Sequence, residues 1–74
     1  MSAWIRFVNK TNFNVIELEI DESEKHFPVY KNIPSRYKYS AGGTTRLKIF
    51  SKNSLILDTV ITTLPSKLNT VILT

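Results

Sequence analysis

The chain contains no cysteine, so disulfide bonds and thiol catalysis are excluded. It contains one histidine, His26, which leaves no second imidazole to complete a zinc site. Its only adjacent glycines, Gly42 and Gly43, lack the lysine and spacing of a phosphate-binding loop and suit backbone freedom at a turn. Because a nucleophile needs a base within hydrogen-bond reach, we expect no enzymatic activity, no catalytic residue, no cofactor and no metal.

Long hydrophobic runs are also missing. The longest apolar stretches, such as Leu55 to Leu57 before Asp58, fall far below the roughly 20 residues needed to cross a bilayer. Arg6 interrupts the first apolar run before the core of a signal peptide, about 7 to 15 residues, can form. We therefore expect neither a membrane span nor a signal peptide, which makes the cytoplasm the default location and leaves the compartment undetermined.

The length of 74 residues predicts a single domain over residues 1–74, because a second core would need on the order of 100 further residues. A domain this small buries only roughly 60% of the surface of its unfolded chain. Without a disulfide or a metal, its core is short of apolar area. Association with a second subunit is one of the few remaining ways to add it.

Hydrophobic side chains recur with a period of two, which is typical of strands. The clearest case is the segment in which Ile16, Leu18 and Ile20 alternate with Glu17, Glu19 and Asp21. Turn-forming clusters separate such segments at about ten-residue spacing, as in sandwiches and barrels. The predicted strands cover residues 4–9, 15–20, 27–31, 36–40, 44–50, 55–62 and 68–73. The sequence therefore predicts an all-β domain of about seven short antiparallel strands.

The pattern also predicts where individual strands lie. Pro28 cannot donate to a sheet ladder, so the segment 27–31 is expected at an edge. The segments 4–9, 55–62 and 68–73 are rich in apolar and β-branched residues, which favours burial on nearly both faces.

Charge is unevenly distributed along the chain. Ten basic and six acidic side chains give a net charge of +4. From Lys25 onward there are eight basic residues and a single acidic one, Asp58. If segments 36–40 and 44–50 form a hairpin through residues 41–43, Tyr37 and Tyr39 enter the core opposite Leu47 and Thr45. The outward residues then form a predicted basic patch of Arg36, Lys38, Arg46 and Lys48. Alternatively, the connection crosses between two sheets and the patch splits.

Five segments resemble a bacterial domain-of-unknown-function family found mostly in secreted and cell-surface proteins. They are Ile5-Arg6-Phe7-Val8-Asn9, the alternating residues 15–20, Tyr30-Lys31-Asn32-Ile33, residues 37–50 with Gly43-Thr44 and Arg46-Leu47-Lys48-Ile49-Phe50, and Leu57-Asp58-Thr59 with Leu64-Pro65. The resemblance implies a transthyretin-like or immunoglobulin-like β-sandwich and carries no catalytic residues. The family's usual Pro-Gly-Thr-Tyr corner is replaced here by Gly42-Gly43-Thr44-Thr45, so no role of the corner tyrosine transfers.

The acidic residues have two interpretations. His26 follows the turn containing Asp21, Glu22 and Glu24, which suggests either a weak cation site or a solvated turn, and we favour the turn. Glu17 and Glu19 lie on the solvent face of a predicted strand rather than in a cleft, so a catalytic carboxylate pair is not expected.

These observations predict a non-catalytic structural or protein-interaction module. The alternative is a small basic β-barrel that binds nucleic acid, which we do not expect because Tyr37 and Tyr39 have opposite parity to the neighbouring cations. We also predict a homodimer, because the acidic stripe of Glu17, Glu19 and Asp21 complements the basic patch in sign. The competing arrangement places both stripes on neighbouring strands, where they neutralise each other within a monomer.

Overall fold

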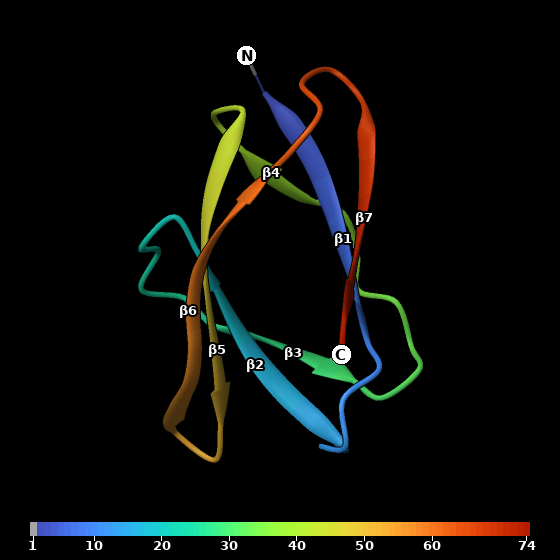
Figure 1. Cartoon of the computed structure of the whole chain (residues 1–74), viewed down its shortest axis with the longest axis vertical. Helices are drawn as coiled ribbons and strands as arrows, with labels where there is room; N and C mark the ends of the chain where they lie inside the picture. Colours follow the sequence, from blue (N-terminus) through green and yellow to red (C-terminus); the bar gives the residue numbers. More distant parts are fainter. Residues whose placement is uncertain (1) are drawn as a thin grey trace.

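The computed structural model describes residues 2–74, which form seven strands in two facing sheets (Figure 1). The strands are β1 (Ala3–Asn9), β2 (Val15–Ile20), β3 (Phe27–Tyr30), β4 (Lys38–Ser40), β5 (Thr44–Ser51), β6 (Ser54–Thr62) and β7 (Leu68–Leu73). Each of the seven overlaps a segment that the sequence predicts as a strand. The all-β, sandwich-like architecture is therefore confirmed. Among residues 2–74, no helix is long and apolar enough to span a membrane.

Sheet A has the order β4-β1-β7, and sheet B has the order β3-β2-β5-β6. All pairs are antiparallel except one, because β7 runs parallel to β1 from Trp4↔Leu68 to Asn9↔Leu73. Figure 1 shows the first and last strands of the chain side by side and pointing the same way. The prediction of an edge position for the segment around Pro28 is confirmed, because β3 ends sheet B.

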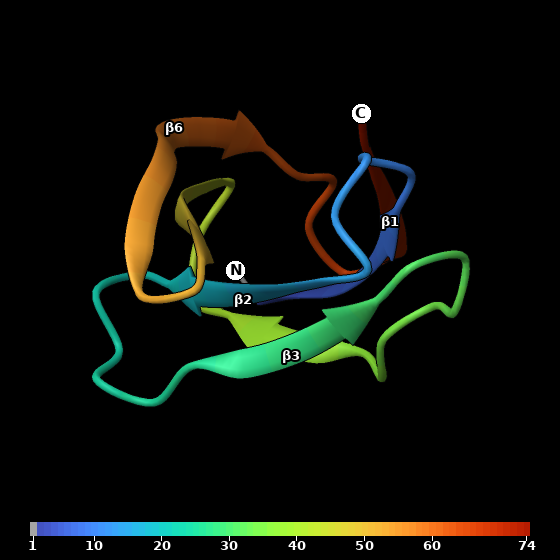
Figure 2. The same ribbon diagram turned by 90° about the horizontal axis from the view of Figure 1, so that it is seen from below.

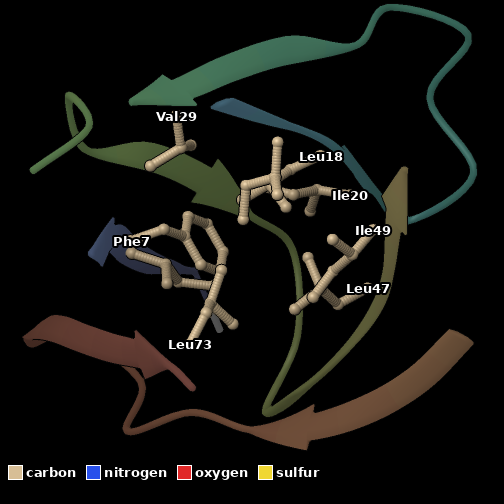
Figure 3. Packing of buried hydrophobic residues seen from close by; sticks show 9 residues of the cluster. Phe7, Leu18, Ile20, Val29, Leu47, Ile49 and Leu73 are labelled. Atoms are coloured by element: carbon tan, nitrogen blue, oxygen red, sulfur yellow. The ribbon is translucent and has the colours of Figure 1, made fainter. Parts of the chain in front are cut away.

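The core lies between the sheets and consists of the inward-pointing residues, which alternate with outward-pointing ones along each strand (Figure 3). Leu18 of β2 and Leu47 of β5 are fully buried, as the alternation predicts. Phe7 of β1 fills the centre, and its ring lies 6.0 Å from that of Phe27. The labelled core side chains in Figure 3 are Phe7, Leu18, Ile20, Val29, Leu47, Ile49 and Leu73.

The predicted two-sided burial of residues 55–62 and 68–73 is wrong. Along β6 every residue is exposed or half-buried, and in β7 only Leu73 is buried. The reason is topological, since β6 and β7 are the outermost strands of different sheets. In addition, the pairing of β5 with β6 shifts register next to Ile49 and Phe50, and β6 bends sharply (Figure 2).

The predicted hairpin between residues 36–40 and 44–50 is also wrong. Strand β4 pairs with β1, and β5 pairs with β2 and β6 in the other sheet, so residues 41–43 cross between sheets. Two buried hydroxyls mark this crossing, with Ser40 Oγ 2.6 Å from Thr45 Oγ1. Gly42 and Gly43 have no positive φ, so the crossing does not require the left-handed freedom of glycine.

A buried asparagine fixes the connection between β1 and β2. Asn9 is fully buried, and its side-chain Nδ2 donates to the carbonyl oxygens of Phe13 and Val29 at 3.1 and 3.2 Å. Its Oδ1 accepts hydrogen bonds from the backbone N–H and the hydroxyl of Thr11. All polar atoms of this side chain are therefore paired, as burial requires.

Candidate interaction surfaces

The outer face of sheet B carries a ladder of alternating charge. Lys48 of β5 lies opposite Glu19 of β2 on one side and Asp58 of β6 on the other. Its Nζ is 3.5 Å from Glu19 Oε2. Cross-strand neighbours of opposite sign stabilise a sheet, so this part of the face is neutralised within one molecule.

Arg46 extends the ladder and holds two carboxylates. Its guanidinium donates twice to Asp58, at 3.2 Å from Nε and 2.9 Å from Nη2, and Nη1 donates to Glu22 at 2.7 Å. The hydrogen bond from Arg46 holds the pKa of Asp58 below its usual value, and the same bond raises the pKa of Arg46. Bidentate geometry of this kind fixes both side chains.

The four residues of the predicted basic patch do not meet. Arg46 and Lys48 belong to the charge ladder of sheet B. Lys38 is the first residue of β4 in sheet A, and Arg36 precedes that strand. The Nζ of Lys38 lies 4.5 Å from the centroid of the Phe27 ring rather than beside an anion. The single patch is therefore wrong, and the split arrangement that a crossing connection implies is the one found.

The predicted acidic stripe is shorter than expected. Glu17 and Glu19 share the outer face of sheet B, but Asp21 lies beyond the end of β2 with φ 51°. Its carboxylate accepts hydrogen bonds from Ser40 Oγ and from the backbone N–H of Arg46, both at 2.9 Å. Asp21 therefore fastens the crossing between the sheets instead of extending a charged surface.

His26 does not join the acidic turn that precedes it. Its ring stacks on Phe50 at 4.5 Å, and Nε2 lies 3.1 Å from Glu19 Oε1, with Nδ1 3.9 Å from Glu17. Within the described range 2–74, no three metal-ligating side chains gather at one point. The imidazole is part of the charged face of sheet B.

The outer face of sheet A is aromatic, apolar and cationic. Cross-strand pairing places Tyr39, Trp4 and Leu68 in one row over β4, β1 and β7. Tyr39 is 57% exposed and Trp4 46%, and their rings meet edge to face with centroids 5.6 Å apart. The expectation that Tyr39 enters the core opposite Thr45 is wrong, because β4 pairs with β1.

Arg6 occupies the next outward position on β1. Its Cζ lies 5.3 Å from the centre of the Tyr37 ring, and its Nε donates to Thr70 Oγ1 at 3.3 Å. Tyr37 is exposed and therefore also lies outside the predicted core. Arg6 of β1 and the aromatic rings thus share one face, whereas Lys38, next to Tyr39 in β4, points the other way toward Phe27, as its parity predicts.

An open groove lies between β6 and β7, where the two sheets do not meet. It has a volume of about 770 Å³, and core residues Leu47 and Ile49 form part of its lining. Leu57 of β6, which is 47% exposed, and Val71 of β7 line it from opposite sheets. The sandwich is therefore incompletely closed along this side.

Sequence reasoning overlooked the residues that build sheet A's surface and loops. Trp4 and Arg6 alternate with Ile5 and Phe7, so their outward direction was available from the pattern. The role of Asn69 was not. The side-chain Oδ1 of Asn69 accepts a hydrogen bond from the backbone N–H of Leu64, and its Nδ2 donates to the carbonyl oxygens of Leu64, Trp4 and Lys67. These bonds attach the loop before β7 to β1.

The chain was compared with protein-family models, with curated proteins and with solved structures. None of the three comparisons finds a match.

Proposed function

We propose that the protein is a non-catalytic interaction module, without a cofactor, that associates with a second copy of itself through the free edge of β7. The observation that carries this proposal is the chemistry of that edge. Strand β7 has six residues, contains neither a charge nor a proline, and pairs with β1 in unbroken register. Unprotected edges of this kind template the addition of another strand.

The other three edges carry protective features. Strand β4 has only three residues, and β3 contains Pro28. Strand β6 contains Asp58, and its pairing with β5 is interrupted by a register shift next to Ile49 and Phe50. Short length, proline, charge and bulges are the devices that block edge pairing. Strand β7 is the edge without such a device.

Backbone alternation specifies the register of the dimer. The carbonyl groups of Lys67 and Leu73 accept hydrogen bonds from Trp4 and Lys10 on the β1 side. Alternate residues of a strand point their backbone groups the opposite way, so those of Leu68, Thr70 and Ile72 face the free edge. An antiparallel pair centred on Thr70 then joins Leu68 to Ile72 of the second copy.

This register is self-complementary about a two-fold axis, which is the commonest symmetry of homodimers. It pairs Leu68 with Ile72 on the outer face, and both side chains are exposed in the single chain. The charged ladder contributes little to the dimer interface, because its members are already paired within each copy. Apolar contacts and backbone hydrogen bonds therefore hold the proposed dimer.

We further propose that the sandwich is transthyretin-like rather than immunoglobulin-like. In the immunoglobulin constant-type order, the first, second, fifth and fourth strands share a sheet. Here β4 lies in the sheet opposite β2 and β5, which argues against that order. An experimental structure with β4 beside β5 would contradict this assignment.

The self-association is tested by light scattering at high protein concentration across a salt series. We expect a dimer whose stability changes little with salt, since the interface contains no charge. Thr70→Pro removes the central N–H of the edge and should give a monomer, whereas Thr70→Val retains that N–H and should remain dimeric. Circular dichroism is the control that tests whether both variants fold. A monomeric parent chain, or a dimeric Thr70→Pro variant, contradicts the proposal.

A further inference from the structure

Charge is segregated between the two sheets. All six acidic residues lie in β2, in the turn after it and in β6, so β1, β4 and β7 contain none. Every ion pair found among residues 2–74 lies on the sheet B side. Sheet A therefore presents positive charge that no carboxylate of its own strands offsets.

The cations of this side surround its aromatic face. Arg6 lies within the face beside Tyr37, and its guanidinium contacts the ring and donates to the Thr70 hydroxyl, both of which are uncharged. Lys67 is exposed, and its carbonyl accepts a hydrogen bond from the backbone of Trp4. Arg36 is exposed and precedes Tyr37 in the chain. Arg6 thus lies in the row beside Tyr39–Trp4–Leu68, and Lys67 and Arg36 directly precede Leu68 and Tyr37 in the chain.

We propose that the outer face of sheet A binds single-stranded nucleic acid. Unpaired bases stack on the exposed rings of Trp4, Tyr37 and Tyr39, and the phosphates lie against Arg6, Arg36 and Lys67. A stacking surface combined with unneutralised cations is the arrangement by which sheet surfaces bind single strands without sequence preference. The inference does not depend on dimerisation, because it uses the face of the sheet and leaves the edge of β7 free.

The rings distinguish this ligand from other anions. An acidic peptide or polyphosphate needs only the cations, and exposed aromatic side chains add little to its binding. Bases offer flat π-faces, and each stacked base contributes substantially to affinity. Three exposed aromatic residues beside unpaired cations therefore favour a ligand that is both anionic and planar.

Trp4 provides a direct probe, because it is the only tryptophan in the chain. A single-stranded oligothymidylate titrated into the protein at low salt should quench its fluorescence. The affinity should fall steeply as salt rises, with a slope of about −0.7 per phosphate contacted. No quenching and no binding at low salt would overturn the proposal.

Matched variants locate the surface, with binding measured by anisotropy of a labelled oligothymidylate. Arg6→Gln and Arg46→Gln each remove one positive charge, but only the first should weaken binding and reduce the salt slope. Tyr39→Ala should lower affinity by roughly 5- to 100-fold. Tyr30→Ala, which removes an equally exposed tyrosine from β3, should leave it unchanged. Equal effects within each pair would contradict the assignment to this face.

Two competitors separate the classes of ligand. Polyphosphate carries the same charge without bases, and polyglutamate represents an acidic protein surface. Both should compete only weakly with oligothymidylate. Binding of polyphosphate or polyglutamate with an affinity equal to that of oligothymidylate would show a general anion site or a protein site, and would overturn the proposal.

Discussion

Lys48 and Glu19 face each other across β5 and β2, with Nζ 3.5 Å from Oε2. They belong to the two oppositely charged groups that the sequence predicts as complementary surfaces of a dimer. Because the pair forms within one chain, it cannot at the same time join two copies. The opposite charges on this face of sheet B are therefore paired within one copy.

The first prediction concerns the strength of this pair. Lys48→Ala should change the free energy of unfolding by less than about 1 kcal/mol, because partly exposed ion pairs contribute little after screening. Glu19 also retains its contact with His26 in that variant. Chemical denaturation of Lys48→Ala, Glu19→Ala and the double variant measures the coupling energy. A coupling energy well above this range would mean that the ladder is essential to the fold.

The second prediction concerns the core. Leu18→Ala should cost roughly 2 to 5 kcal/mol, because it leaves a cavity at a fully buried position. Domains of this size have little stability to lose, so the variant should be largely unfolded. Glu17→Ala, at the neighbouring outward position, should unfold like the parent chain. If Leu18→Ala left the stability unchanged and Glu17→Ala unfolded the chain, the inward and outward faces of β2 would be the reverse of those described.

A third prediction follows from the buried asparagine. Asn9→Ala leaves the carbonyl groups of Phe13 and Val29 without the donor they have now. Losing buried hydrogen bonds of this kind costs about 1 to 3 kcal/mol, so the variant should unfold at clearly lower denaturant concentration. Asn12→Ala, at an exposed position in the same connection, is the matched control. Equal stability of the two variants would show that Asn9 does not hold the loop.

The fourth prediction concerns acid. The folded-state pKa of Asp58 is lowered, chiefly by its hydrogen bond from Arg46. The ionised carboxylate therefore favours the folded state above the unfolded pKa, and this contribution is lost as pH falls through the lower folded pKa. Arg46→Gln should raise the pKa of Asp58 toward its ordinary value, which an NMR titration of the carboxyl carbon can follow. An unchanged titration midpoint would rule out Arg46 as the cause.

Strand positions were predictable because alternation is a local property of the chain. Ile16, Leu18 and Ile20 specify an inward face wherever their strand is placed. The partner of each strand is not local information. Tyr39 has the same parity in a hairpin with β5 and in a pair with β1, but it is buried in the first and exposed in the second. The predictions of the basic patch and of inward-pointing tyrosines were both wrong because they assumed the wrong partner for β4.

Surface chemistry was predictable only where it depended on one strand. The outward direction of Glu17 and Glu19 followed from β2 alone, whereas their neutralisation required the pairing of β2 with β5. The contacts of Asn9 and Asn69 join segments distant in the chain, and no periodicity announces them. Composition did indicate correctly that basic residues outnumber acids, but only the sheet order shows where the excess lies.

The parallel pairing of β1 with β7 has a consequence for how the chain is made. Trp4 pairs with Leu68 and Asn9 with Leu73, so the central strand of sheet A obtains one of its two neighbours from a segment 64 residues further along the chain. Such long-range closure is slow compared with local pairing. A nascent chain on the ribosome can assemble sheet B, whose strands end at Thr62, while β1 remains half-paired. Sheet A is therefore completed only after β7 has been synthesised.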